Sequence, residues 1–295
     1  MPTAFLLRCA SLALTAAFCV ACRDLPTTFI WATYSLGFAH YFLALRYSTR
    51  QVGQVLARTS QVLSLLGVAF LIFALYYDDF PLVAYFGVHH VLNEAYLQRS
   101  PAMAAPAPRR LQAASAAFHA AVYATVLRAD PGFAWVEWAW AVPALVAVTA
   151  LFVRELTTVR AAAPGARVLD LCGSELAAAV LLAASLFVRV TFLQTVLYHF
   201  VLWALLPVDR IRARGGFALA EYAGLSVALV AVAVLLSPLG PSTTQIGTVT
   251  FSRQFLFWSY AHITLSFALS DAHPVWVRRL FRGAGPAVAP ATRAA

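Results

Sequence analysis

Long apolar runs alternate with short arginine-rich joints over almost the whole chain. Each run is close to the length of about 20 residues that a helix needs to cross a hydrocarbon layer about 30 Å thick. They lie at about residues 3–22, 27–46, 61–77, 80–97, 111–128, 133–153, 169–187, 190–206, 217–237 and 253–270. Alternating apolar and polar stretches, which a transmembrane barrel requires, are too short and too few. The pattern predicts an all-α, polytopic transmembrane helix bundle of about ten spans, forming one integral membrane domain over residues 1–295.

Two places in this pattern leave the span count open. The first run resembles a signal peptide or signal anchor in its small residues before Arg23, but Arg8 is its only early positive charge and no good cleavage site follows. We therefore favour a retained span. The seventh and eighth runs are separated only by Arg189, which makes that boundary the weakest. Residues 271–295 follow the last run and are expected to form a cytoplasmic tail.

The composition excludes a plain soluble enzyme. Hydrophobic residues make up 62% of the chain and charged residues 11%, whereas soluble domains carry about a quarter charged residues. So little polar sequence leaves no room for a separate water-soluble domain. Membrane lipids are therefore the expected surroundings of the chain.

The net charge of +9 comes from 21 basic residues, and all of them are arginine. If the chain has ten spans, sixteen arginines fall in the even joints and the C-terminal tail and four in the odd joints. This bias follows the positive-inside rule and predicts that both termini are cytoplasmic. The absence of lysine and the abundance of alanine and arginine suggest a bacterial inner membrane. No basic stretch is interleaved with aromatic residues, so nucleic acid is not an expected partner.

The histidines carry the functional signal, because five of the predicted spans place an imidazole at one depth. The helical rise puts them about 9 to 12 Å from the predicted cytoplasmic edge, six to eight residues from the span ends. They are His40, His90, His119, His199 and His262. A single intramembrane histidine often only bonds a neighbouring helix. Five at one level favour a metal or haem site, because ionisable groups in lipid are costly and imidazole is the commonest metal ligand.

Two neighbours extend this set of candidates. His89 precedes His90 and points about 100° away from it on a regular helix, so the two are not expected to bind one ion. Glu94 lies four residues after His90 and shares its face. It is a candidate ligand, acceptor for an imidazole N–H, or base, with an interfacial carboxylate as the equal alternative. The candidate metal ligands are therefore His40, His89, His90, His119, His199 and His262, and the candidate catalytic residue is Glu94.

The spacing of four histidine segments resembles that of a known membrane enzyme family. The segments are Phe38-Ala39-His40-Tyr41, His89-His90-Val91-Leu92-Asn93-Glu94, Leu197-Tyr198-His199-Phe200 and Tyr260-Ala261-His262-Ile263. Their order over about residues 27–273 is similar to that of the bacterial and archaeal membrane β-carotene 15,15′-dioxygenases (the Brp/Blh-like family). That resemblance implies a ferrous iron held by separated histidines, with O₂ and a polyene as substrates. In the family, the third segment usually has a second histidine where this chain has Trp203.

Three functions are expected from these residues. The first is an iron-dependent membrane oxygenase for an apolar lipid or carotenoid-like substrate. In it, Fe(II) is held by His40, His90, His199 and His262, and Glu94 orients an imidazole or a water. His119 or His89 is either a substitute ligand or a residue that supports a ligand. The second is a haem b electron carrier in which two of the histidines are axial ligands. The third is a lipid or metabolite carrier whose histidines relay protons.

Overall fold

The computed structural model describes residues 4–47, 79–97, 108–130, 133–162, 168–246 and 249–269, with five further residues between 273 and 280. These residues form an almost entirely helical bundle, which confirms the all-α prediction. The helices are α1 (Ala4–Ala21), α2 (Pro26–Tyr47), α5 (Asp79–Leu92), α6 (Arg109–Val126), α7 (Trp138–Ala162), α8 (Val168–Ala184), α9 (Phe192–Leu205), α10 (Val208–Arg212), α11 (Gly216–Leu236) and α12 (Phe251–Leu269).

Short irregular elements extend or join these helices. A π-helix, η1 (Asn93–Leu97), continues α5, while 3-10 turns follow α6 as η2 (Leu127–Ala129) and α11 as η4 (Ser237–Leu239). The strands β1 (Gln245–Ile246) and β2 (Val249–Thr250) pair antiparallel before α12. The sequence pattern did not predict this small hairpin, because two-residue strands are too short to show a period of two.

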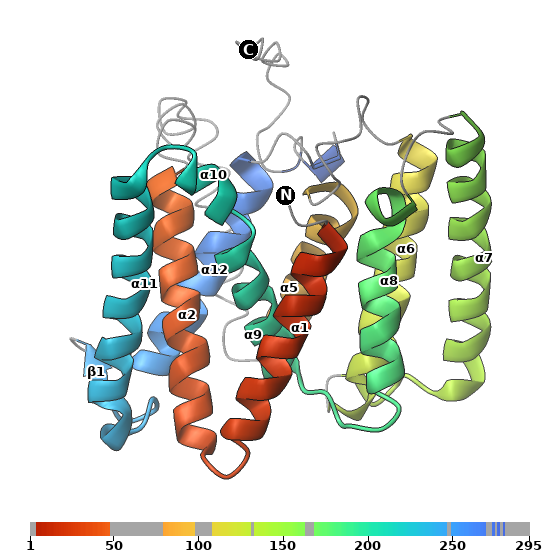
Figure 1. Cartoon of the computed structure of the whole chain (residues 1–295). Helices are drawn as coiled ribbons and strands as arrows, with labels where there is room; N and C mark the ends of the chain where they lie inside the picture. The colour runs from red at the N-terminus through yellow and green to blue at the C-terminus, as the bar shows by residue number, and fades with distance from the viewer. Residues whose placement is uncertain are drawn as a thin grey trace.

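Nine of the ten predicted apolar runs coincide with a helix, and the run at 61–77 lies outside the described residues. Helices α1 and α2 run in opposite directions, as do consecutive long helices from α5 to α12, and α1 begins at the end of the bundle where α12 ends (Figure 1). The chain breaks near Arg189 as predicted, and α9 then begins at a capping box in which Thr191 and Gln194 bond each other's backbone N–H. Only α7 departs clearly from its predicted range: it starts at Trp138 and continues past the apolar run through polar residues to Ala162.

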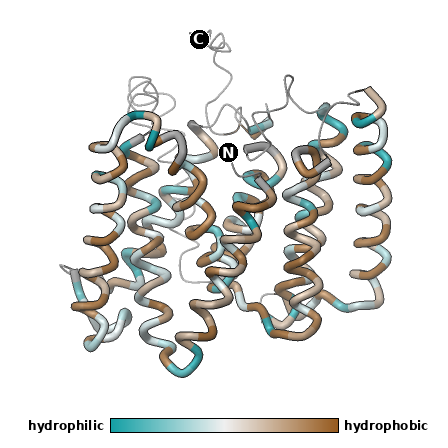
Figure 2. Tube along the Cα trace, viewed as in Figure 1, coloured by the Kyte–Doolittle hydropathy of each residue, from teal (hydrophilic) through white to brown (hydrophobic). Residues whose placement is uncertain are grey.

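The two outermost helices expose apolar faces. In the most apolar windows of α7 and of α11 with η4, only 6% and 11% of residues are buried inside the protein, and both helices are long and apolar enough to cross a membrane. They lie at opposite edges of the bundle, where α11 packs on α2 and α7 packs on α6, and hydrophobic residues extend along most of their length (Figures 1 and 2). A core helix of a soluble protein would bury such residues, so these faces suit a lipid environment.

Close packing at Gly37 brings α2, α9 and α12 together. A Cβ added at Gly37 would lie 2.5 Å from Cε2 of Phe255 and 2.9 Å from the ring of Phe200. The missing side chain therefore lets aromatic rings of α9 and α12 lie directly on the α2 backbone. His40 follows one turn later on α2, so this contact also fixes how near its imidazole comes to the other two helices.

Replacing Gly37 by alanine should destabilise the bundle by about 1–3 kcal/mol, because overpacking displaces the two phenylalanine rings. Gly224 on α11 is the matched control, since a Cβ there meets no heavy atom within 4 Å. Thermal unfolding in one detergent checks the pair: G37A should lower the Tm and G224A should leave it unchanged or slightly higher. Equal melting temperatures would contradict the close approach at Gly37.

Candidate metal centre

Imidazole rings from four helices meet inside the bundle. His40 on α2 and His262 on α12 are the nearest pair, with their Nε2 atoms 3.0 Å apart and ring centroids 4.4 Å apart. The His199 ring on α9 lies 5.5 Å from that of His40. The His89 ring at the end of α5 lies 5.2 Å from His199 and 5.6 Å from His262. We call these four residues the histidine cluster.

The spacing within the cluster suits donors that share one ion. Two imidazole nitrogens that each lie about 2.1 Å from a metal are about 3.0 to 3.4 Å apart at octahedral or tetrahedral angles. The Nε2 atoms of His40 and His262 have this separation. Among the described residues, no three His, Cys, Asp or Glu side chains already converge closely enough to hold an ion. Binding would therefore require rotation of the His89 and His199 rings towards the close pair.

Two of the four rings in the cluster are shielded from water by the surrounding bundle, whereas His40 and His262 are half-buried. His89 and His199 are each 2% exposed, and aromatic rings of Phe86, Phe200 and Trp203 lie within 5.3 to 6.1 Å of the His199 ring. The indole N–H of Trp203 has no hydrogen-bond partner among the described residues. A dry environment of this kind strengthens any polar contact made inside it, and the Trp203 N–H adds one hydrogen-bond donor beside the imidazoles.

His90 takes a different position from the one expected for it. The sequence favoured His90 over His89 as a ligand, but His89 is the residue that borders the two large cavities beside the cluster. The His90 ring lies 5.7 Å from Tyr123, 6.1 Å from Tyr198 and 6.0 Å from His199. The rotation of about 100° between adjacent helical residues separates the two rings, and the structure assigns the cluster position to His89.

Asn93 is a site residue that the sequence analysis missed. Its amide nitrogen lies 3.0 Å from Nε2 of His89, and the side chain is 1% exposed at the first residue of the π-helix η1. Nδ1 of His89 has no partner among the described residues. The sequence spacing could have identified it, because Asn93 follows His89 by four residues, just as Glu94 follows His90. If the amide is turned so that its Oδ1, which has no partner among the described residues, accepts from Nε2–H, then Nδ1 of His89 carries no proton and can bind a metal.

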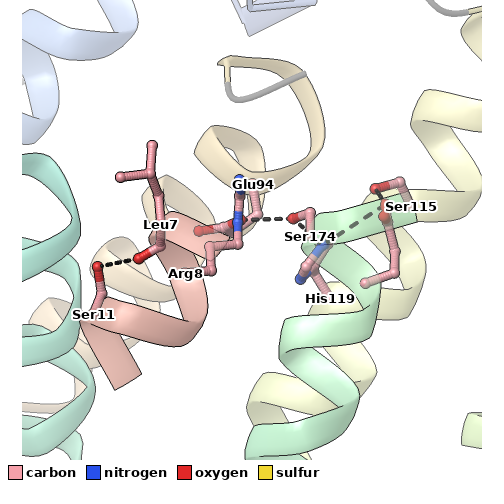
Figure 3. Close-up of polar contacts among 8 residues, drawn as sticks. Leu7, Arg8, Ser11, Glu94, Ser115, His119 and Ser174 are labelled. Carbon is pink, nitrogen blue, oxygen red and sulfur yellow. Dashed lines mark hydrogen bonds and ion pairs between the residues drawn. The ribbon is translucent and has the colours of Figure 1, made fainter. Parts of the chain in front are cut away.

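His119 and Glu94 belong to a separate buried network (Figure 3). The Ser174 hydroxyl on α8 donates to Oε2 of Glu94 at 2.6 Å and lies 3.0 Å from Nε2 of His119 on α6. His119 also lies 3.9 Å from a carboxylate oxygen of Glu175, which accepts a hydrogen bond from Ser115. The sequence predicted His119, at the same depth, as a candidate that could substitute for one of the ligands or support one, and in the structure it lies beside Ser174 and Glu175.

Glu94 is bound by an arginine from the first helix. Nε of Arg8 lies 2.7 Å from Oε2 of Glu94, and the two side chains are 1% and 4% exposed (Figure 3). The predicted role for Glu94 was to orient an imidazole or a water, whereas the structure commits one of its oxygens to Arg8 and Ser174. This ion pair ties α1 to η1, and α1 also packs against α8 and α9. The first helix is thus part of the bundle that surrounds the site.

Two cavities adjoin the histidine cluster on different sides. Cavity 1 has a volume of about 240 Å³ and extends from His89, His199 and His262 to Leu82, Asp130 and Phe192, near the starts of α5 and α9. Cavity 2 has a volume of about 460 Å³ and extends from His40, His89 and His262 to Ile211 and Arg214, beside α10. Tyr41 and Phe200 border both cavities, and most of the remaining lining residues are apolar. The imidazoles therefore lie where two apolar cavities approach each other.

Comparisons with known protein families, with curated proteins and with solved structures found no match for this chain.

The Arg8–Glu94 pair makes a direct test of the polar network. Arg8→Met should lower the free energy of unfolding by about 3–5 kcal/mol, because it leaves the Glu94 carboxylate buried without its cation. Adding Glu94→Gln to this variant should recover much of the loss, since the uncompensated charge is then removed. Thermal unfolding of wild type, R8M and R8M/E94Q checks the prediction. A double variant no more stable than R8M would argue against a buried ion pair.

Proposed function

We propose that the chain is a polytopic integral membrane protein of about ten spans, in a bacterial inner membrane with both termini cytoplasmic. Three observations support this proposal: the alternating direction of the long helices from α5 to α12, the lipid-compatible faces of α7 and α11, and the bias of arginines towards one set of joints. A bundle embedded in this way draws apolar molecules from the bilayer more readily than water-soluble ones.

Within the bundle, the histidine cluster holds one ferrous iron and the protein is an oxygenase. The observation that carries this proposal is the meeting of four imidazoles from four helices, two of them with Nε2 atoms 3.0 Å apart. When bound there, an iron with imidazole ligands and open positions supplies O₂ chemistry. His40, His89, His199 and His262 would hold it, and Asn93 would orient the His89 ring. The resemblance to the membrane β-carotene dioxygenases favours the same chemistry.

The cluster favours a single iron over haem b. A haem with two axial histidines needs the two rings on opposite faces of a wide flat macrocycle. Here the imidazoles of His40 and His262 are in direct contact, and the rings of His89 and His199 lie within 5.6 Å of them. The His40 and His262 rings are too close together for a macrocycle to lie between them, whereas a single ion requires that the His89 and His199 rings turn towards this pair.

The substrate is a long apolar molecule, such as a lipid or a carotenoid-like polyene. Cavities 1 and 2 both border His89 and His262, and we propose that an extended chain passes these imidazoles with one part in each cavity. The residues of this chain bind and orient the substrate through apolar contacts and exclude water from the reacting carbon atoms. Phe200 and Tyr41, which border both cavities, would lie beside the part of the substrate nearest the cluster.

Iron content distinguishes ligands from neighbours. Detergent-purified wild type should contain about one iron per chain with no Soret band, because the donor set comprises four imidazoles and suits a mononuclear, non-haem centre. His199→Ala and His262→Ala should each lose most of the iron. His119→Ala is the matched control, since it removes a buried imidazole from the separate network and should keep the iron. Elemental analysis with a visible spectrum measures all four proteins.

The other outcomes of this measurement point to the other functions. A Soret band would move the protein to the haem class. Folded wild type with no metal would exclude both the iron oxygenase and the haem protein, and it would favour a lipid or metabolite carrier. Loss of iron in H119A equal to that in H262A would show that the two networks are not separate. If iron is found, a screen of polyenes and lipids under O₂ follows, with product mass as the readout.

Asn93 should affect the metal without holding it. Asn93→Leu leaves the four imidazoles in place but removes the amide beside Nε2 of His89, so iron affinity should fall by about 10- to 100-fold. Competition with a chelator of known affinity gives the change, and circular dichroism checks that the variant is folded. An unchanged affinity in folded protein would exclude Asn93 as a positioning residue.

A further inference from the structure

Trp203 brings to cavity 2 a hydrogen-bond donor that the described residues leave unused. Its indole borders the cavity on α9, and its ring lies 5.8 Å from that of His40 and 6.1 Å from that of His199. The Nε1 atom is buried and has no hydrogen-bond partner among the described residues. Buried indole N–H groups usually find a partner, because an unsatisfied donor inside a protein is costly. A ligand in the cavity can supply this partner.

The wall of cavity 2 around Trp203 is mostly apolar. Its lining from α2, α9 and α12 includes Leu36, Ala39, Leu43, Ala44, Phe200 and Leu265. Two hydroxyls of α11 that border the cavity are used within the protein, because Tyr222 donates to the carbonyl oxygen of Ala204 and Ser226 donates to that of Tyr222. A ligand in this cavity is therefore held mainly by apolar contacts, and few polar groups can select its orientation.

An indole N–H can only donate, and this property limits the polar group that it can hold. A carbonyl oxygen accepts and carries no hydrogen of its own, so one bond from Trp203 satisfies it. A hydroxyl would also accept, but its own O–H would then need a second acceptor in a mostly apolar wall. A pure hydrocarbon would leave the indole unsatisfied. The donor therefore favours a carbonyl compound.

We propose that cavity 2 binds a long apolar substrate that carries one carbonyl group, with the carbonyl oxygen on the indole N–H of Trp203. The indole has to turn towards the cavity to form this bond, because Nε1 is buried. This inference rests on the proposed function in one respect, since it names the substrate class of the oxygenase. Ketones with an isoprenoid or fatty chain belong to this class.

Holding the carbonyl at Trp203 would fix which carbon atoms lie beside the histidine cluster. A pure hydrocarbon can slide along an apolar cavity, whereas a chain bound through its oxygen presents the same carbon atoms in every complex. Because the Trp203 ring lies within 6.1 Å of the His40 and His199 rings, these are the atoms nearest to the carbonyl. Trp203 would be a specificity-determining residue that contacts the substrate without holding the metal.

Binding of methyl undecyl ketone, of the corresponding secondary alcohol and of tridecane tests the proposal, because the three probes share one chain length. Purified full-length protein in phosphatidylcholine nanodiscs is titrated with each radiolabelled probe, and empty nanodiscs supply the non-saturable background. Wild type should bind the ketone more tightly than the alcohol and about tenfold more tightly than the hydrocarbon, as expected for one buried hydrogen bond. Trp203→Phe keeps an aromatic ring but removes the N–H, so the preference for the ketone should disappear.

Two matched variants separate the Trp203 N–H from other causes. Trp31→Phe removes another buried indole N–H that lacks a partner in the described part of the chain, and Trp31 borders neither cavity. Ser266→Ala removes a hydroxyl-bearing residue that borders cavity 2 on α12. Both variants should keep the preference for the ketone. In protein with isotope-labelled tryptophan, the ketone should shift the indole N–H resonance that is missing from W203F.

Each outcome bears on one proposal. A ketone that wild type binds no more tightly than the other probes, or an unchanged preference in folded W203F, would overturn the carbonyl contact. Loss of the preference in S266A alone would do the same. If W203F does not fold, the three probes on wild type, W31F and S266A still decide whether a carbonyl is preferred.

The iron content of the same preparation separates this inference from the proposed function. Ketone-selective binding in iron-free protein would retain the carbonyl site and reject the oxygenase. Iron-loaded protein that binds the three probes equally would retain the metal centre and reject the carbonyl site.

Discussion

Polar side chains inside this bundle must satisfy one another, because apolar surroundings offer neither water nor lipid oxygen as a partner. The helices are therefore arranged so that their few buried polar residues meet. Arg8 reaches Glu94 across 86 positions of sequence, and Ser174 lies between Glu94 and His119. The histidine cluster follows the same rule, but its imidazoles are all of one kind and neutralise no charge. In the protein alone, His40 and His262 contact each other and His89 contacts Asn93, and we propose that a metal cation is the further partner of this set.

The interior therefore contains two polar regions, and they differ in their effect on the protein. The network of Arg8, Glu94, Ser174 and His119 links α1, η1, α8 and α6 through charge and hydrogen bonds, and it stabilises that half of the bundle. The histidine cluster joins α2, α5, α9 and α12 and adjoins the two large cavities. The packing at Gly37 also affects the histidine cluster, because the close approach of α2 to α9 and α12 determines how near the imidazoles come to one another.

Hydropathy alone predicted most of the helices, because a span of apolar residues must be helical in lipid whatever it packs against. The depth of each histidine in the predicted membrane also followed from the sequence, and it identified His40, His199 and His262 as candidates for one site. The rotation of each helix about its own axis could not be predicted from the sequence. His90 was therefore preferred as a ligand, whereas the structure places His89 beside the other three imidazoles. The partner of Glu94 was beyond prediction, since nothing in the local sequence links it to Arg8. Asn93 could have been found from its spacing to His89. The extension of α7 to Ala162 shows that a helix can continue beyond its apolar run.

The proposed centre is one iron that is shared by four imidazoles on four helices. X-ray absorption at the iron edge of the purified protein tests it most directly, because the method reports the atoms around the metal. The spectrum should show nitrogen and oxygen donors at about 2.1 Å from the iron, with the outer scattering of several imidazole rings. Histidine-to-alanine variants within the cluster should reduce this outer scattering or abolish the signal. A porphyrin-type shell, a sulfur shell, or no bound iron in folded protein would contradict the account.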